Sequence, residues 1–385
     1  MSCSLCELKT ILQTYDDTDP RWIVMDCMTC FLPMVVWRGE PLHTMEISAQ
    51  DTMEMEEALN RVAQEKFGGE DFYIDKKQNK IPDHLHWHAR PNGWSLKVYF
   101  APNWGQTPEE MLRDYALQSP NGLAKWESME ATTNPDEAKF LIIQDNCDIA
   151  LMEKFLPHCR LYFSREAVDF NSHQKYPPSL VTRASFWDDS GLLWTKWIYP
   201  NKATGGINKT YDTLIAEKHP PKKTNFISCV QSNKQMTVGH VLRQNFINEF
   251  LSLFPDELHL FGSIRTANKE LPDNDKYYAL SPYKYCLAFD NQDFIKNFFG
   301  TQFTDAILYW TVPIYWGGAE LSKFFPEDAF IQIDIKQKGE AERVMEILHN
   351  DNYEKRIPAL REARNLILNK YNVWPTIYRT IKELL

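Results

Sequence analysis

The sequence contains no run of about 18 apolar residues, and its first stretch, MSCSLCELKTILQTYDD, has no apolar core of signal-peptide length. We therefore expect a cytoplasmic protein with no membrane insertion. Positive charge is also scarce, because the chain has 42 Lys and Arg residues and 52 Asp and Glu residues, which gives a formal net charge of −10. This balance argues against nucleic acid or an anionic membrane surface as the main partner. Any phosphate ligand must then be held by a local group of residues.

Internal repeats and low-complexity tracts are absent, and the eight cysteines are too few for a secreted disulfide scaffold. The two CxxC pairs, Cys3/Cys6 and Cys27/Cys30, both lie near the start of the chain. Their position favours reduced thiols or a metal site over disulfides. A chain of 385 residues is too long for one hydrophobic core, so we expect two or three domains.

Two breaks divide the chain. The first is the turn signal ARPNGW, which closes a domain at residues 1–92; within it, SAQDTMEMEEALNRVAQEKFGG predicts a helix capped by serine and ended by Gly-Gly. The second is the tandem proline Pro220-Pro221 with its neighbouring lysines, which predicts an exposed linker.

Short apolar strands alternate with helical stretches from Leu96 onward, and this alternation predicts α/β units with parallel sheets covered by helices. We expect one unit at residues 96–219, a second at 222–368, and a C-terminal helix at 369–385 that packs back. Two such units place a ligand cleft at the carboxyl ends of their strands.

Three motifs follow one another in the second unit: FDN at residues 289–291, GTQ at 300–302 and VPIYWG at 312–317. Their order resembles the donor domain of family 10 glycosyltransferases, the α1,3/4-fucosyltransferases, and the resemblance extends over about residues 96–370. It implies a GT-B-like pair of Rossmann-like domains that moves fucose from GDP-fucose to a glycan hydroxyl with inversion and without a cofactor.

The resemblance also implies roles for individual residues. Arg243 holds the donor pyrophosphate, Asn291 belongs to the donor site, and Glu166 is the general base. The chemistry gives each a reason, because a leaving diphosphate needs cations or amide groups, and an acceptor hydroxyl needs a carboxylate to take its proton. Each residue also has a purely structural alternative. Arg243 would then be a solvated arginine on a helix, Asn291 a turn residue, and Glu166 an ordinary surface carboxylate.

The chain departs from the family pattern at one place. Where the family has Glu and Lys for the ribose and the phosphate, this sequence has Thr301 and Gln302, so one charge-assisted contact is missing. Lys296 is our candidate for reaching the same phosphate. Two alternatives stay open: a glycan- or nucleotide-binding protein with a degenerate transferase fold, and a transferase that uses a different nucleotide sugar.

The stretch DHLHWHARP places His84, His86 and His88 on one face if it is extended. One interpretation is an edge strand with a polar outer face. Together with the first CxxC pair and His43, however, the stretch resembles the histidine-triad (HIT) family, which predicts an α+β HIT-like domain over residues 1–92. That resemblance implies His86 as a nucleophile on a nucleotide phosphate and His88 as a phosphate contact.

The zinc-bearing branch of the HIT family implies a structural zinc site at Cys3, Cys6, His43 and His84, a donor set that suits tetrahedral coordination. The alternative is a pair of unliganded cysteines. We expect Cys27 and Cys30 in the core, in a strand-like setting that points their side chains apart. Arg90 replaces the last apolar triad position, and the loop before the triad reads DKKQNKIPD, with no Gly and without the Gln at its expected place. The fold and nucleotide binding are therefore better-supported expectations than turnover. A further hypothesis is that this domain processes the GDP that the transferase releases.

Overall fold

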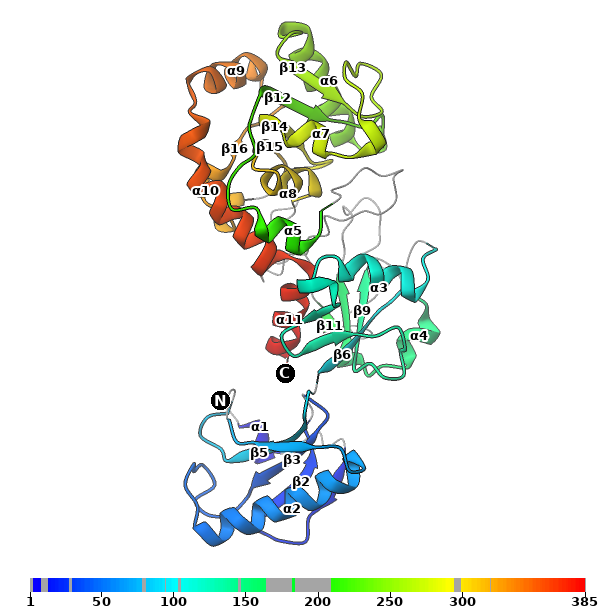
Figure 1. Ribbon diagram of the computed structural model, residues 1–385, viewed down its shortest axis with the longest axis vertical. Helices are drawn as coiled ribbons and strands as arrows, with labels where there is room; N and C mark the ends of the chain where they lie inside the picture. Colours follow the sequence, from blue (N-terminus) through cyan, green and yellow to red (C-terminus); the bar gives the residue numbers. More distant parts are fainter. Residues whose placement is uncertain are drawn as a thin grey trace. The chain divides into compact units, whose positions relative to one another are not determined.

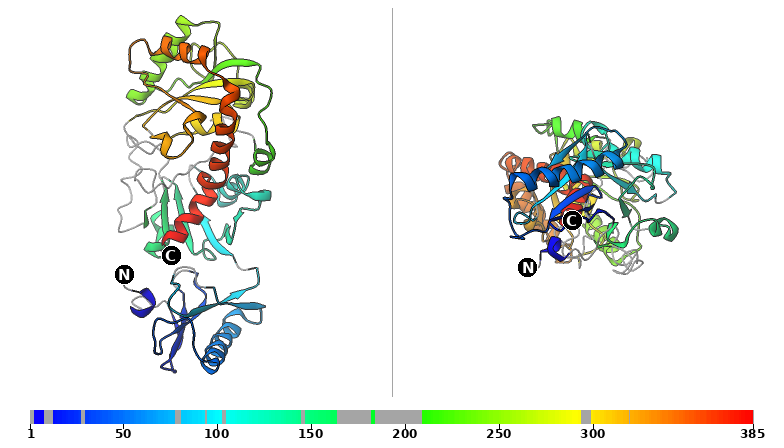
Figure 2. Two further views of the ribbon diagram at one scale, coloured as in Figure 1. Left: turned by 90° about the vertical axis from the view of Figure 1, so that its left-hand side faces the viewer. Right: turned by 90° about the horizontal axis from the view of Figure 1, so that it is seen from below.

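The computed structural model, drawn in Figures 1 and 2, divides the chain into two compact units at residues 1–96 and 97–383. The structure describes residues 3–7, 13–27, 30–77, 81–93, 95–102, 105–144, 147–163, 182–183, 209–293, 299–318 and 320–384.

The first unit is a five-stranded antiparallel sheet in the order β1-β2-β3-β5-β4, with one long helix packed on it. Its elements are α1 (Ser4–Glu7), β1 (Thr14–Asp16), β2 (Trp22–Asp26), β3 (Pro33–Trp37), α2 (Ala49–Phe67), β4 (Phe72–Asp75) and β5 (His86–Pro91). The predicted helix is confirmed. The Ser48 side chain accepts a hydrogen bond from the Asp51 N–H at its start, and Gly68 ends it in the left-handed conformation.

Strand β5 lies inside this sheet, between β3 and β4. Its apolar side chains, Leu85 just before the strand and Trp87 and Ala89 within it, pack in the core under α2. The three histidines alternate with them and are all buried. The interpretation of an edge strand with a polar outer face is therefore wrong, because β5 has a hydrogen-bonded neighbour on each side.

Cys27 and Cys30 lie in the loop that joins β2 to β3. The loop is closed by backbone hydrogen bonds from the Cys27 N–H to the Leu32 carbonyl (2.9 Å) and from the Phe31 N–H to the Cys27 carbonyl (2.8 Å). Both cysteines are buried in an apolar cluster, as expected. The expected strand-like setting is wrong, because the turn brings both side chains to the same part of the core.

The second unit begins with a sheet in the order β11-β10-β9-β6-β8-β7. Strands β6, β9, β10 and β11 pair in parallel, whereas β7 and β8 form an antiparallel hairpin. The elements of this part are β6 (Leu96–Phe100), α3 (Pro108–Ala116), β7 (Lys125–Trp126), β8 (Met129–Ala131), β9 (Phe140–Gln144), α4 (Ile149–Glu153), β10 (Arg160–Phe163), β11 (Thr182–Arg183) and α5 (Tyr211–Ala216).

The other sheet of the second unit is wholly parallel, in the order β13-β12-β14-β15-β16. Its elements are β12 (Asn225–Val230), α6 (Val238–Leu253), β13 (Leu258–Phe261), α7 (Tyr277–Leu280), β14 (Tyr283–Phe289), α8 (Thr301–Leu308), β15 (Val312–Trp316), β16 (Ile331–Gln332) and α9 (Glu340–Asn350). The sequence predicted this alternation. Because the strands are parallel, every helix that follows a strand begins at the carboxyl edge of the sheet.

The C-terminal segment consists of α10 (Tyr353–Leu366), a π-helical turn (Ile367–Tyr371) and α11 (Val373–Leu384), the red helices of Figure 2. Arg364 of α10 is buried and donates hydrogen bonds to the carbonyls of Leu214 and Leu308. The Trp374 indole N–H donates to the Tyr115 carbonyl on α3 at 2.8 Å. The segment thus bonds to elements on both sides of the linker. Among the described helices, none is long and apolar enough to cross a membrane.

Candidate functional site

Two helix N-termini lie at the carboxyl edge of the parallel sheet, since α6 follows β12 and α8 follows the neighbouring strand β14. The loop after β14 contacts the first turn of α6. A Cβ atom on Gly239 would lie 2.0 Å from the Asn291 carbonyl oxygen, so this approach requires glycine. The Thr237 hydroxyl, which caps α6, donates to the same carbonyl at 3.1 Å. Free backbone N–H groups at such helix ends bind phosphate groups readily.

Arg243 lies on α6, and its side chain is only 8% exposed. One guanidinium nitrogen, Nη1, donates to the Phe289 carbonyl at 3.3 Å, and Nε has no hydrogen-bond partner among the described residues. Burial lowers the pKa of Arg243, and the nearby charge of Asp290 opposes that shift. The alternative of a solvated helix arginine is therefore wrong. A buried guanidinium with an unsatisfied donor fits an anionic ligand such as a diphosphate.

Asp290 connects the end of β14 to the start of α8. Its carboxylate accepts hydrogen bonds from the Gly300 N–H at 3.0 Å and from the Tyr315 hydroxyl. Burial raises the pKa of Asp290 to about 6, although these hydrogen bonds and Arg243 act in the opposite direction. In the sequence this acidic residue is part of the FDN motif, which predicted no role for it. Its place directly between Phe289 and Asn291, at a strand end, was the available signal.

The predicted donor residues Asn291, Thr301 and Gln302 all lie at this same edge of the sheet. Thr301 is the first residue of α8, and the Gln302 amide donates to the Val230 carbonyl at the end of β12 (3.4 Å). Glu166 and Lys296, the other residues predicted for the transferase site, lie outside the described residues. Their roles stay predictions.

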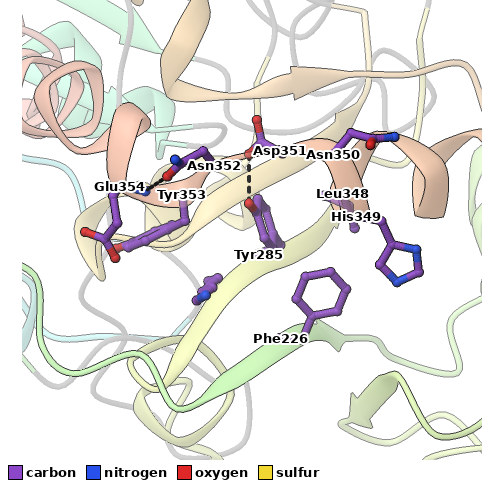
Figure 3. Close-up of a pocket in the computed structure, with 10 residues that line it drawn as sticks. Phe226, Tyr285, Leu348, His349, Asn350, Asp351, Asn352, Tyr353 and Glu354 are labelled. Carbon is purple, nitrogen blue, oxygen red and sulfur yellow. Dashed lines mark hydrogen bonds between the residues drawn. The ribbon is translucent and has the colours of Figure 1, made fainter.

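A pocket of about 450 Å³ lies elsewhere in this half of the chain, and Figure 3 shows its lining. Phe226 and Tyr285 belong to the first halves of β12 and β14, and the Tyr285 hydroxyl donates to Asp351 at 2.7 Å. The pocket is therefore near the amino ends of the strands, at the opposite edge from Asn291. Ligands of parallel α/β sheets bind at the carboxyl ends, so we do not place the donor in this pocket.

In the first unit, the side chains of Cys3, Cys6, His43 and His84 converge. Their candidate ligand atoms all lie within 4.8 Å of one another. Cys3 Sγ is 3.3 Å from Nδ1 of His84, and Cys6 Sγ is 3.2 Å from Nε2 of His43. The other ring nitrogen of His84 is 2.8 Å from the Trp37 carbonyl, which turns Nδ1 toward the thiols. Two thiolates and two imidazoles with such outer hydrogen bonds fit a tetrahedral zinc ion.

His86 and His88 are buried on the same strand, with ring centroids 5.5 Å apart. Nδ1 of His86 is 2.7 Å from the His84 carbonyl, so this nitrogen carries the proton and Nε2 carries the free lone pair. Burial lowers the pKa of His86. His88 lies together with Cys27 and Cys30 in a second convergent group, which the sequence did not predict.

Comparison with known families identifies part of the chain. Residues 220–355 match the family model described as glycosyltransferase family 10 (fucosyltransferase) C-term. Residues 220–355 therefore form a domain similar to the C-terminal part of family 10 glycosyltransferases. This segment includes Arg243, Asp290, Asn291 and the helix N-termini of α6 and α8, so the site described above belongs to the matched domain.

A curated relative and several solved structures are similar to the chain. It is 30% identical over 138 residues to the α-(1,3)-fucosyltransferase FucT of Helicobacter pylori, a match that covers 35% of this chain and 27% of the relative. The chain thus matches about a quarter of that relative's length. A crystal structure of an α1,3-fucosyltransferase is 18% identical, with 75% of this chain and 83% of the other covered and a TM-score of 0.42. A GDP-fucose complex of an α1,3-fucosyltransferase is 16% identical, covers 75% and 89%, and has a TM-score of 0.37.

Proposed function

We propose that residues 97–383 form an inverting, GT-B-like glycosyltransferase that moves fucose from GDP-fucose to a glycan hydroxyl. The observation that carries the proposal is Arg243, a buried guanidinium with an unsatisfied Nε, on a helix that begins at the carboxyl edge of the sheet within the family 10 domain. That edge is where parallel α/β sheets bind nucleotides.

Donor binding follows from the groups at this edge. Arg243 meets the diphosphate, and the first N–H groups of α6 and α8 supply further donors. Asn291, Thr301 and Gln302 supply polar contacts, and Lys296, which lies outside the described residues, supplies a second cation in place of the missing family lysine. Because these groups meet the charge that grows on the diphosphate as it leaves, the proposed transfer uses no cofactor.

The proposed transfer is a single displacement. The acceptor oxygen attacks the anomeric carbon of fucose from the face opposite the diphosphate, and the carbon–oxygen bond to GDP breaks. The electron pair of that bond leaves with GDP, and the acceptor proton goes to the carboxylate of Glu166. Attack from the opposite face inverts the anomeric centre.

A second candidate function is glycan or nucleotide binding without transfer, or transfer from another nucleotide sugar. The observation that favours it is Gln302, whose neutral amide bonds to the Val230 carbonyl where the family pattern has a charged lysine. Titration of the full chain with GDP, GDP-fucose and UDP-glucose separates the donors. Binding of GDP-fucose without any sugar transfer would favour the binding protein.

For residues 1–96 we propose a HIT-like nucleotide-binding or hydrolysing domain with a structural zinc ion. Two observations support it: β5 of the antiparallel sheet carries His86 and His88, two residues apart and both buried, and Cys3, Cys6, His43 and His84 converge. A zinc ion on these residues would fasten the N-terminal segment to the sheet. His86, with Nε2 free, is the proposed nucleophile on a nucleotide phosphate, and His88 is the proposed phosphate contact.

The test is a transfer assay with GDP-fucose and a mixed panel of glycan acceptors, run on the full chain and on two variants. We expect fucosylated product from the wild type, none from Glu166→Gln, and an unchanged rate from His86→Ala, because His86 belongs to the other unit. The anomeric configuration of the product tests inversion. Nucleotide products that depend on His86 and not on Glu166 would instead make the first unit the working enzyme.

A further inference from the structure

We propose that Cys27, Cys30 and His88 form a second metal site in the first unit, which binds Zn²⁺ through two thiolates and one imidazole. The site is separate from the convergent group of Cys3, Cys6, His43 and His84, and shares no residue with it. The inference does not rest on the proposed transferase function.

The fold places three suitable ligands together in the core. Cys27 and Cys30 come from the closed loop between β2 and β3, and His88 lies on β5, where it pairs with Met34 of β3. The ligand atoms of the three side chains lie within 4.8 Å of one another. Cys2His is the set of protein ligands that zinc takes in sites with one further position for water or another ligand.

His88 gives an independent sign of a missing partner. Its side chain is 8% exposed, and its Nδ1 atom makes no hydrogen bond to any part of the chain that the structure describes. An unsatisfied buried polar atom costs about 1–3 kcal/mol, so native proteins rarely keep one without a reason. A metal ion that accepts the imidazole lone pair removes this cost. Cys27 and Cys30 are not joined by a disulfide, so both sulfur atoms are available as metal ligands.

Charge supports a divalent, thiolate-preferring ion. Two thiolates and one Zn²⁺ sum to zero, so the occupied site buries no net charge, whereas two thiolates alone would be costly to bury. The nearest cationic side chain on β5, Arg90, is paired with Asp75 at 2.7 Å and does not replace the ion. Where the HIT-like function also holds, an ion on His88 would lie beside His86, and its fourth position would meet the phosphate in place of the His88 ring.

The test is zinc counting on the purified full chain after dialysis, by elemental mass spectrometry. We expect two zinc ions per chain in the wild type and in Cys147→Ser, a control cysteine that lies in neither group. We expect one ion in the double variant Cys27→Ser/Cys30→Ser. We also expect one in Cys3→Ser/Cys6→Ser, which leaves the proposed site untouched and so tests it even if the first double variant fails to fold.

Each result decides the matter. A single zinc ion that Cys3→Ser/Cys6→Ser keeps and Cys27→Ser/Cys30→Ser loses would support the proposal and contradict the structural zinc site of the HIT-like domain. A single ion with the opposite pattern, or no zinc at all, would overturn it. A Cys27–Cys30 disulfide in a peptide map of the non-reduced chain would overturn it too, because it would show a redox pair instead of a metal site.

Discussion

Replacement of Arg243 by methionine separates its role in binding from any role in folding. Methionine keeps an unbranched side chain at this buried position on α6 and removes the charge. In the structure Arg243 has one long hydrogen bond, to the Phe289 carbonyl, and an unsatisfied Nε. We therefore expect the unfolding midpoint of Arg243→Met to equal or exceed that of the wild type, since a poorly paired buried cation is removed.

GDP binding should respond in the opposite direction. Hydrogen bonds to charged groups contribute about 1.5–3 kcal/mol, so the Kd for GDP should rise roughly 10- to 100-fold in Arg243→Met. Isothermal titration calorimetry measures the Kd, and thermal circular dichroism measures stability. Arg361→Met is the matched control, because Arg361 is an exposed residue on α10 and should leave both values unchanged. An unchanged Kd in Arg243→Met, or a clear loss of stability, would refute the reasoning.

Three further predictions concern the same edge of the sheet. Gln302→Lys restores the charge of the family pattern and should lower the Kd for GDP about tenfold, which corresponds to about 1.4 kcal/mol of binding free energy. Calorimetry measures this Kd, and weaker binding would contradict the prediction. Gly239→Ala places a methyl group 2.0 Å from the Asn291 carbonyl oxygen and should cost about 1–3 kcal/mol in urea unfolding, together with weaker GDP binding; wild-type values would show that the loop moves freely. Burial raises the pKa of Asp290 to about 6, so the folded state binds this proton more tightly than the unfolded state, and stability should fall as pH rises from about 4 to 6. Asp290→Asn should flatten that part of the melting-temperature profile, and an equally steep profile in the variant would assign the slope to other groups.

Local signals allowed the sequence to predict much of the fold. Ser48 and the Gly68-Gly69 pair mark both ends of α2, because a side-chain cap and a left-handed residue act within one turn of the helix. The alternation of short apolar strands with helices predicted the parallel sheet of β12 to β16. The antiparallel β7–β8 hairpin was not predicted, since its strands are only two and three residues long.

The loop of Cys27 and Cys30 was missed for a physical reason. It lies within the apolar run IVMDCMTCFLPMVV, which has no Gly or Asn to mark a turn, so its periodicity matches a strand. Phe31 instead adopts a positive φ of 57°, a conformation that its residue type does not predict. The approach of this loop to His88 depends on the pairing of β3 with β5, which no local pattern records.

The sequence also did not predict the side-chain hydrogen bonds at the carboxyl edge of the parallel sheet, where the donor is proposed to bind. Asp290 contacts Gly300 and Tyr315 across 10 and 25 residues, and these partners are set by the sheet rather than by spacing. The approach of Cys3 to His84 spans 81 residues, and its expectation came from a family resemblance. Glu166 and Lys296 lie outside the described residues, so the general base and the second cation rest on sequence alone.

The most direct test of the account measures GDP release from GDP-fucose by the full chain, with the acceptor panel present, for the wild type and Arg243→Met. The account predicts acceptor-dependent GDP release by the wild type and a rate at low donor concentration that is roughly 10- to 100-fold lower in the variant, in line with the lost hydrogen bonds to the diphosphate. Equal rates in the two proteins, or release of nucleotide from UDP-glucose but not from GDP-fucose, would contradict it.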